Sequence, residues 1–308
     1  MKNVFNHGSA GTTGLRIRER LEARTDIRLV LLPDALRKDP DAVRSTLNGC
    51  DIAFLCLPDD AAREAVSMLE NPDTVVLDTS TAHRTAEGWA YGFPELSEAH
   101  YLAVRESKRI AVPGCHASGF IALTGPLVEA GLLSRDAQLA CFSLTGYSGG
   151  GKKMIAQYED PARDPLLGAP RQYGIAQVHK HLPEMAAVSG LSIAPAFCPV
   201  VADFYSGMEV TVPVFASQLN GTAEDVREVF RRCYRGPVVR YAEDADESGF
   251  LSAAAFSGKD SMEIGVYGNA ERILLTARYD NLGKGASGAA VECMNIVLGA
   301  DPVTGLCL

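Results

Sequence analysis

The sequence predicts an α/β protein that combines a doubly wound parallel sheet with a second, α+β domain, and three observations support this fold class. The 308 residues, 47% hydrophobic and 22% charged, have ordinary globular composition and suffice for two domains. In the first third, short apolar runs alternate with amphipathic stretches, the pattern of strands connected by crossover helices. After residue 115 the β-type runs follow one another with few helices between them, which is typical of an antiparallel sheet.

The first domain is expected to span residues 1–114. Its predicted strands are 2–5, 27–32, 51–57, 74–78 and 109–112, and its predicted helices are 14–24, 39–47 and 59–70. Strands that alternate with helices in this way form a parallel sheet with helices on both faces.

The second domain is expected to span residues 115–284. Helices are predicted over 116–131 and 223–235, and strands over 138–144, 191–197, 207–215, 262–268 and 272–280. The last predicted helix, 284–300, can pack back on the first domain. We therefore expect residues 285–308 to complete that domain.

The formal charge of −9 and the isoelectric point near 5.2 argue against a nucleic-acid or anionic-membrane surface, because few cations are available to neutralise phosphates. The start of the chain lacks the charged and apolar regions of a signal peptide, and no apolar run approaches the ~18 residues of a membrane span. We expect a cytoplasmic protein with small-molecule substrates.

The eight cysteines show neither a CxxC pair nor the spacing of a zinc site, so no metal is expected. They occupy positions 50, 56, 115, 141, 198, 233, 293 and 307.

A glycine-rich turn follows the first predicted strand in the stretch VFNHGSAGTTGLRI. Glycines there let the backbone approach a pyrophosphate, whose charge is met by N–H groups at the start of the next helix. The spacing is GxxGxxG and not GxGxxG, and a plain tight turn is the alternative. In this strand-turn-helix context we predict a Rossmann-type dinucleotide site formed by Gly8, Ser9, Ala10, Gly11, Thr12, Thr13 and Gly14.

Two cations near the end of the second predicted strand favour NADP over NAD. Arg37 and Lys38 suit a 2′-phosphate, whereas NAD enzymes carry an acid for the ribose hydroxyls at this point. Asp34 lies in the same segment, and a solvated charge cluster is the alternative interpretation.

Cys115, in VPGCHASGF, stands where an apolar run opens into a predicted helix. A helix N-terminus lowers the pKa of a thiol, and the thiolate is the nucleophile. A buried core cysteine is the competing interpretation, and this residue alone does not decide between them.

The stretch VHKHLPEM places His179, His181 and Glu184 close together. Thiolate chemistry needs an acid or base that titrates near neutrality, which histidine supplies. A metal site is the alternative, but no other His or Cys residues cluster with this pair.

The stretch GYSGGGKKM offers backbone N–H donors and two cations. Such a loop suits a phosphate or carboxylate, with a flexible surface loop as the alternative. A dinucleotide domain, a cysteine that can hold an acyl group, a histidine and an anion loop together make up an acylating aldehyde dehydrogenase.

Nine motifs, in order from residue 8 to about 295, resemble N-acetyl-gamma-glutamyl-phosphate reductase in its shorter type 2 form. They are GSAGTTG, CLPDDAA, DTSTAHR, YGFPEL, VPGCHASGF, GYSGGGKKMI, HKHLPEM, DFYSGM and DNLGKGASGAAV. The resemblance implies a Rossmann domain joined to a glyceraldehyde-phosphate-dehydrogenase-like α+β domain. It also implies NADPH-dependent reduction of N-acetyl-L-glutamyl 5-phosphate to N-acetyl-L-glutamate 5-semialdehyde and phosphate, in arginine biosynthesis.

The resemblance also implies roles for individual residues. Cys115 would form a thioester that the nicotinamide reduces, with His181 as acid/base, His179 in reserve and Glu184 orienting the histidine or meeting the substrate. Further cofactor contacts are expected from Leu57, Pro58, Ser80, Asn281 and Gly285, although a structural turn also explains the last two. Substrate contacts are expected from Arg84, Ser148, Gly149 and Lys152, although Arg84 can instead brace a loop. The superfamily commonly forms homodimers or homotetramers.

Position 116 departs from the family pattern, because many relatives have an aromatic residue after the cysteine and this chain has His116. We expect this side chain on the helix face turned away from the sulfur, since neighbouring side chains on a helix diverge.

Three other functions remain open. Aspartate-semialdehyde dehydrogenase shares the fold and the chemistry, and a carrier-bound glutamyl or aminoadipyl phosphate is an alternative substrate. An NADPH-binding redox sensor that uses Cys115 without turnover belongs to a different class.

Overall fold

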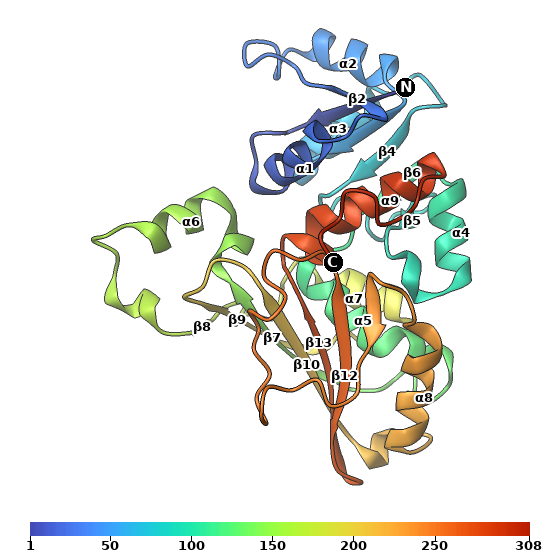
Figure 1. Cartoon of the computed structure of the whole chain (residues 1–308), viewed down its shortest axis with the longest axis vertical. Helices are drawn as coiled ribbons and strands as arrows, with labels where there is room; N and C mark the ends of the chain where they lie inside the picture. The colour runs from blue at the N-terminus through green and yellow to red at the C-terminus, as the bar shows by residue number, and fades with distance from the viewer. The chain divides into compact units, whose positions relative to one another are not determined.

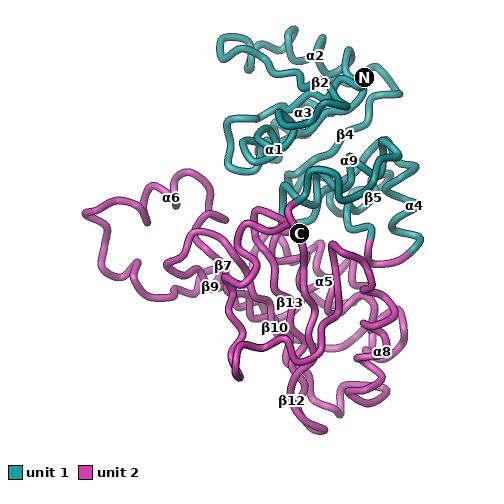
Figure 2. Tube along the Cα trace, viewed as in Figure 1, with its two compact units in different colours: residues 1–94, 98–114, 286–306 teal, residues 95–97, 115–285, 307–308 magenta.

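The computed structural model describes residues 1–308, which divide into two compact units (Figure 2). Unit 1 comprises Met1–Pro94, Glu98–Gly114 and Ala286–Leu306. Unit 2 comprises Glu95–Ser97, Cys115–Gly285 and Cys307–Leu308. The chain passes from unit 1 to unit 2 between Gly114 and Cys115, directly before the candidate nucleophile.

Unit 1 contains a six-stranded parallel sheet in the order β2-β1-β3-β4-β6-β5 (Figure 1). Its strands are β1 (Lys2–His7), β2 (Ile27–Val30), β3 (Ile52–Leu55), β4 (Val75–Asp78), β5 (Ala90–Tyr91) and β6 (Arg109–Ala111). β3 and β4 are buried along their whole length, as expected for central strands covered on both faces.

Helices cover both faces of this sheet, as the alternating pattern predicted. One face packs against α1 (Thr12–Glu22), α4 (Glu98–Glu106) and α9 (Gly288–Leu298), and the other against α2 (Pro40–Gly49) and α3 (Asp59–Ser67). The C-terminal helix α9 is buried on all sides except near its end, which explains its nearly continuous apolar sequence.

The turn between β1 and α1 requires glycine at two positions. Gly8 has φ +88°, and a Cβ there would overlap the carbonyl oxygen of Cys56. A Cβ at Gly14 would overlap the carbonyl oxygen of Gly8. Helix α1 begins after Gly11 without a side-chain cap, so its first N–H groups point to the open side of this turn.

Unit 2 contains a seven-stranded sheet in the order β11-β12-β13-β10-β7-β9-β8. Its strands are β7 (Ala140–Gly146), β8 (Arg171–Gln172), β9 (Ala196–Ala202), β10 (Met208–Phe215), β11 (Val239–Tyr241), β12 (Met262–Gly268) and β13 (Arg272–Tyr279). Helices α5 (Cys115–Glu129), α7 (Leu182–Ser189) and α8 (Ala223–Cys233) contact one another or the sheet, and α6 (Gly151–Glu159) follows β7.

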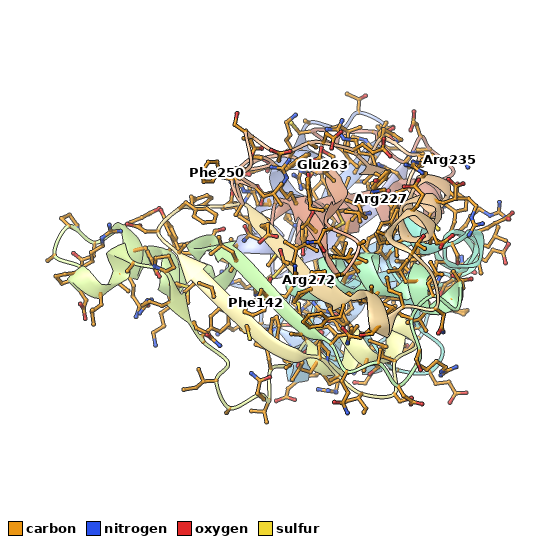
Figure 3. The ribbon with its side chains drawn as sticks, turned by 90° about the horizontal axis from the view of Figure 1, so that it is seen from below. Phe142, Arg227, Arg235, Phe250, Glu263 and Arg272 are labelled. Carbon is orange, nitrogen blue, oxygen red and sulfur yellow. The ribbon has the colours of Figure 1, made fainter.

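The opposite face of this sheet carries exposed apolar side chains. Phe142 of β7 is 49% exposed and Leu274 of β13 is 41% exposed. Figure 3 shows Phe142, Arg272 of β13 and Glu263 of β12 along the sheet. The helices of unit 2 therefore bury one face and leave apolar groups on the other.

Two expectations for this region were wrong. The sheet is mixed and not purely antiparallel, because β7 pairs parallel to β9 and β11 parallel to β12. The strand expected over 191–197 instead runs from Ala196 to Ala202, because the chain first leaves α7 through left-handed Gly190. Helices α4, α6 and α7 and the short strands β5, β8 and β11 were not expected from the sequence.

Gly8→Ala should destabilise the protein by about 1–3 kcal/mol, because it combines a left-handed backbone with a clash against fixed backbone atoms. Gly88→Ala is the matched control, since Gly88 has φ +78° but open space where its Cβ would lie. Urea unfolding of the two variants separates the clash from the backbone conformation. Equal losses of stability would show that the β1–α1 turn is not tightly packed.

Candidate functional site

Cys115 is the first residue of α5, and its helix turn is fixed by a side chain from β13. The Tyr279 hydroxyl donates to the Cys115 carbonyl oxygen at 2.6 Å and accepts from the Gly119 N–H at 3.0 Å. These are the two groups that would bond to each other in a regular first turn. A Cβ at Gly119 would lie 2.7 Å from that hydroxyl, so this position has no room for a side chain.

Gly285 lies against the candidate nucleophile. A Cβ at Gly285 would be 3.0 Å from the Cβ of Cys115, and its N–H donates to the carbonyl oxygen of Asp280 at 3.0 Å. The structure therefore gives this glycine a packing role beside Cys115. Its expected contact with the cofactor remains a prediction.

Three histidine rings meet in unit 2. His179 and His181 stand in the turn before α7, with ring centroids 4.7 Å apart. The ring of His116 lies 5.7 Å from that of His179 and 5.6 Å from that of His181. His116, which we expect on the helix face turned away from the Cys115 sulfur, packs against both candidate acid/base residues.

His116 is held as a neutral imidazole. Its Nδ1 lies 2.6 Å from the Ser143 hydroxyl and its Nε2 lies 2.6 Å from the Tyr173 hydroxyl, so both ring nitrogens are occupied. Burial, together with the charge of His179, lowers the pKa of His116 to about 3. His116 is therefore not available as an acid or base near neutral pH.

His179 and His181 differ in their surroundings. The Nδ1 of His179 accepts from the His181 backbone N–H at 3.2 Å, which leaves Nε2 as the protonated nitrogen of the neutral ring. Burial, with a smaller effect of Lys180, lowers the pKa of His179. His181 is 5% exposed, and Glu184, in the first turn of α7, is 1% exposed.

The expected anion loop is tied to Asn281. The Asn281 amide donates to the Ser148 hydroxyl at 3.0 Å and accepts from the Gly207 N–H at 2.9 Å. Ser148 and Asn281 are both buried, which favours a structural role for these side chains. The cofactor contact predicted for Asn281 stays a prediction.

Gly149 and Lys152 complete this loop. A Cβ at Gly149 would lie 3.3 Å from the Asn281 amide nitrogen, so the loop backbone runs close to that side chain. Lys152 is exposed in the first turn of α6. Its side chain, like that of neighbouring Lys153, is open to a charged solute.

In unit 1, the expected cofactor residues gather at the carboxyl edge of the parallel sheet. The glycine-rich turn follows β1, Leu57 and Pro58 follow β3, and Ser80 follows β4. Arg37 and Lys38 lie between β2 and α2, and Arg37 forms only a loose ion pair with exposed Asp34, at 3.5 Å. This edge is where parallel α/β sheets bind nucleotides.

Ser80 and Arg84 each have partners inside unit 1. The Ser80 hydroxyl donates to buried Asp78 at 2.7 Å, and Asp78 also lies 2.6 Å from Nδ1 of His83. Arg84 donates to the carbonyl oxygens of Val112 at 2.9 Å and Thr79 at 3.1 Å. These bonds match the alternative in which Arg84 braces a loop.

One buried ion pair next to the cysteine helix was not expected from the sequence. Lys284, directly before Gly285, is 1% exposed and donates to both carboxylate oxygens of Glu95, at 2.6 and 2.7 Å. Both residues lie in the quoted motifs YGFPEL and DNLGKGASGAAV, but nothing in the spacing of these motifs links them.

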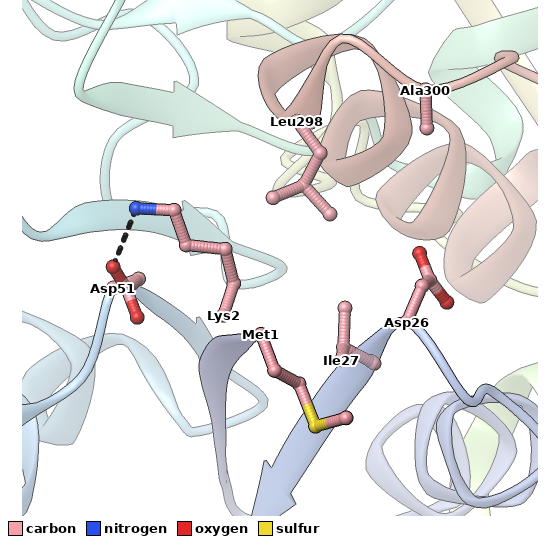
Figure 4. A pocket seen from close by; sticks show the side chains of 7 residues that line it. All are labelled: Met1, Lys2, Asp26, Ile27, Asp51, Leu298 and Ala300. Atoms are coloured by element: carbon pink, nitrogen blue, oxygen red, sulfur yellow. Dashed lines mark hydrogen bonds and ion pairs between the residues drawn. The ribbon is translucent and has the colours of Figure 1, made fainter.

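A pocket also opens at the opposite, amino-terminal edge of the unit 1 sheet (Figure 4). Lys2 and Asp51 form an ion pair of 2.7 Å on its wall. None of the predicted site residues lines it. The structure shows no cluster of three or more His, Cys, Asp or Glu residues able to hold a metal ion, and no helix has the length and apolar character that a membrane span requires.

Comparison with known proteins assigns both units. Residues 33–103 match the family model described as semialdehyde dehydrogenase, NAD binding domain, and residues 115–281 match semialdehyde dehydrogenase, dimerisation domain. A curated protein of Pseudomonas putida, N-acetyl-gamma-glutamyl-phosphate reductase 2, is 43% identical over 96% of this chain and 97% of its own length. The chain belongs to the N-acetyl-gamma-glutamyl-phosphate reductase family. The resemblance seen in the nine motifs is thereby confirmed.

Other members and solved structures agree. The N-acetyl-gamma-glutamyl-phosphate reductase of Rhizobium meliloti is also 43% identical, over 96% of this chain and 99% of its own length. Aspartate semialdehyde dehydrogenase II of Vibrio cholerae superposes with a TM-score of 0.74 at 18% identity, covering 97% of this chain and 98% of that one. The latter shows the fold alone. It confirms the expected Rossmann-type sheet joined to an α+β domain in this reductase family.

His116 should make the stability of the protein depend on pH. Its pKa is 6.5 in the unfolded chain and about 3 in the folded one, so between these values only the unfolded chain takes up the proton. Stability contributed by the neutral ring is full above pH 6.5 and falls as the pH drops, by up to ~1.4 kcal/mol per pH unit. From pH 7 to pH 5, wild type should lose about 2 kcal/mol more than His116→Phe in urea unfolding.

Tyr234→Phe is the control for this measurement. It removes a buried hydroxyl that donates to the Ala122 carbonyl at 2.6 Å, but no group that titrates in this range. The control should keep the wild-type pH dependence. If His116→Phe keeps it too, His116 is not buried as a neutral ring.

Proposed function

We propose that the chain catalyses the NADPH-dependent reduction of N-acetyl-L-glutamyl 5-phosphate to N-acetyl-L-glutamate 5-semialdehyde and phosphate, in arginine biosynthesis. The observation that carries this proposal is a cysteine at the start of a buried helix, within a unit that also contains two candidate acid/base histidines. The names of relatives 43% identical over nearly the whole chain supply the substrate.

The first chemical step is assigned to Cys115. Its sulfur attacks the acyl carbon, and the bond from that carbon to the phosphate oxygen breaks. Phosphate departs, and the acyl group stays on the sulfur as a thioester. The positive end of the α5 helix dipole favours the thiolate before attack and negative charge on the acyl oxygen during it. The Tyr279 hydroxyl holds the first turn in place.

The residues of the β1–α1 turn fit a dinucleotide. Backbone atoms occupy the positions where a Cβ of residue 8 or 14 would lie, so both positions require glycine. The start of α1 has no side-chain cap and offers its N–H groups to a pyrophosphate. When bound, NADPH supplies the hydride that reduces the thioester carbon. The C–S bond then breaks, the aldehyde leaves and the Cys115 thiolate is restored.

His181 is our choice for the acid/base, with His179 in reserve. His116 is excluded, because both of its nitrogens are occupied and its pKa is about 3. The backbone N–H that fixes Nδ1 of His179 belongs to His181, so the two rings are positioned together. Glu184, one turn into α7, would orient the acid/base or meet the substrate.

For the anionic substrate, Lys152 is the best placed of the predicted contacts, because it is exposed beside the backbone N–H groups of Gly149 and its neighbours. Ser148 contributes by shaping that loop through Asn281. Arg84 would act on the substrate through the loop that it braces.

Oligomerisation and location extend the proposal. We infer a homodimer or homotetramer, because residues 115–281 match a family model described as a dimerisation domain and one face of this sheet exposes Phe142 and Leu274. A cytoplasmic location is inferred from the biosynthetic reaction named for the relatives.

The alternative functions are weaker. Aspartate-semialdehyde dehydrogenases share the fold at 18% identity or less in the solved structures compared here, whereas the relatives with high identity carry the N-acetylglutamyl name. A redox sensor would need neither paired histidines nor an anion loop.

The reverse reaction tests the proposal. With NADP, phosphate and N-acetylglutamate semialdehyde, the enzyme should produce NADPH, and Cys115→Ser should lower turnover at least ~10³-fold because no thioester forms. Cys307→Ser, which changes an exposed cysteine, is the control and should retain activity. Turnover with aspartate semialdehyde but not with N-acetylglutamate semialdehyde would contradict the assignment. Unchanged turnover in Cys115→Ser would contradict it too.

The NADP preference rests on Arg37 and Lys38. Arg37→Ala should raise the KM for NADPH about 10-fold by removing a charge-assisted bond to the 2′-phosphate, and should leave the KM for NADH unchanged. Lys38→Ala should act in the same direction. Arg44→Ala, which removes an exposed arginine of α2 paired with Glu70, is the control. Equal effects on both cofactors would place the 2′-phosphate elsewhere.

A further inference from the structure

Lys284 is a buried lysine to which the proposed chemistry gives no task. Its side chain is 1% exposed, and its Nζ donates to both carboxylate oxygens of Glu95, at 2.6 and 2.7 Å. Taking two charges out of water costs free energy that their attraction only offsets, and an apolar pair of similar volume is often as stable. Stability alone therefore does not account for two buried charges at this place.

The segment that carries Lys284 has an uncommon backbone. The Gly285 N–H donates to the carbonyl oxygen of Asp280, five residues earlier, at 3.0 Å, and Gly283–Ser287 (η5) forms a π-helical turn. Such turns are rare, because the bond to the fourth residue of an α-helix is the commoner arrangement, and they occur frequently at functional sites. Relaxation to the α form would rotate the residues of this turn, so the turn needs support from outside.

The ion pair with Glu95 provides that support within unit 2. Glu95 belongs to η1 (Pro94–Leu96), which buried Leu96 anchors at 5% exposure. The Lys284 side chain is packed over its whole length, and this packing leaves it few rotamers. An ion pair at the end of such a side chain therefore holds the backbone of residue 284 in place.

Gly285, the next residue, lies against the side chain of Cys115. A Cβ at Gly285 would be 3.0 Å from the Cβ of Cys115 and 3.4 Å from its Cα. The sulfur of a cysteine can occupy three staggered positions around the Cα–Cβ bond. Backbone packed this closely on one side of the Cβ excludes the sulfur from that side. The place of Gly285 therefore limits the directions in which the nucleophile can point.

Tyr279 and Gly285 hold different parts of Cys115. The Tyr279 hydroxyl donates to the backbone carbonyl oxygen at 2.6 Å, whereas Gly285 packs on the side chain. Nucleophilic attack needs both, because the sulfur and the acyl carbon must approach to roughly 3–3.5 Å with the correct alignment.

We propose that the Glu95–Lys284 ion pair is a positioning element that holds the π-helical turn in place, so that Gly285 directs the sulfur of Cys115 towards the acyl carbon. In this role Lys284 and Glu95 touch neither substrate nor cofactor and act through the backbone of Gly285. The inference rests on the proposed function, in which Cys115 is the nucleophile.

The decisive variant combines Glu95→Leu with Lys284→Met. This paired variant leaves no charge buried alone, so its midpoint of urea unfolding should stay close to that of the wild type. In the reverse reaction its kcat should fall about 10²-fold, because a misplacement of ~1 Å costs that much. The kcat/KM for N-acetylglutamate semialdehyde should fall by the same factor, since the loss is confined to the transition state. Wild-type kcat in the folded paired variant would overturn the proposal.

Gly285→Ala tests the contact directly. Its methyl group, 3.0 Å from the Cys115 Cβ, should displace the sulfur and lower kcat about 10²-fold. Gly125→Ala is the matched control in α5 and should keep wild-type kcat, because the nearest atom would lie 3.8 Å from its Cβ. Gly285→Ala added to the paired variant should lower kcat no further, since both changes act through one contact. Losses that multiply would contradict the proposal.

Alkylation separates position from charge. The rate at which iodoacetamide modifies Cys115, followed against pH by mass spectrometry, reports ionisation of the thiol and needs neither substrate nor cofactor. The pH of half-maximal rate should be the same in the wild type and the paired variant. A rise of about one unit would show that the Lys284 charge acts on the thiolate itself, and the positioning role would be wrong.

Crystal structures make the result independent of the reaction. The Cys115 sulfur should occupy one staggered position in the wild type and a different or divided one in the paired variant and in Gly285→Ala. An unmoved sulfur in the paired variant would overturn the proposal. If the sulfur moves as expected but the wild type does not turn over N-acetylglutamate semialdehyde, the proposed function fails and the positioning role stands.

Glu95→Gln replaces the paired variant if the latter does not fold. Glutamine has the shape of glutamate and keeps one oxygen as an acceptor for Lys284, so kcat should fall by a smaller factor, about 10-fold. The sulfur position and the alkylation profile are measured in the same way. Wild-type kcat together with an unmoved sulfur in Glu95→Gln would overturn the proposal.

Discussion

The Tyr279 hydroxyl, placed between the Cys115 carbonyl and the Gly119 N–H, is the interaction on which the candidate site of unit 2 depends. It joins the first turn of α5 to β13, the strand beside β10 in the centre of the sheet. Because α5 is apolar and buried over most of its length, packing alone would fix its axis but not the start of its first turn. The Tyr279 hydroxyl fixes the start of the first turn, and Gly119, which has no side chain, leaves room for that hydroxyl.

Lys284 and Asn281 are buried together with polar partners. Lys284 is matched by both oxygens of Glu95, and Asn281 uses its amide on two loops. An unpaired buried charge would destabilise the folded state by several kcal/mol. A buried charge with a partner instead holds its segment of the chain in one conformation. The loop that carries Ser148 and the segment that carries Gly285 are thereby held before any substrate arrives, which reduces the ordering needed on binding.

Local constraints explain what the sequence could predict. The β1–α1 turn needs glycine for reasons contained within a few residues and one neighbouring strand, so its pattern is visible in the sequence. The helix predicted over 116–131 was observed as Cys115–Glu129, because the pattern that forms it is likewise contained within its own segment. The partners of Asn281 and Lys284 lie more than 70 residues away and follow from sheet register and loop paths. The parallel pairing of β7 with β9 could not be predicted either, because a short apolar run does not indicate whether the neighbouring strand is parallel or antiparallel.

His116 shows where a correct local rule led to an incomplete conclusion. Neighbouring side chains on a helix do diverge, so the imidazole of His116 and the sulfur of Cys115 leave α5 in different directions. The segment that returns after α6 places Tyr173 against Nε2 of His116, and the following turn adds His179 and His181. An aromatic residue at this position could fill the same space, but it could not bond to the Ser143 and Tyr173 hydroxyls from two ring nitrogens as the imidazole does. The substitution of a histidine here therefore changes the hydrogen-bonding of the site more than its packing.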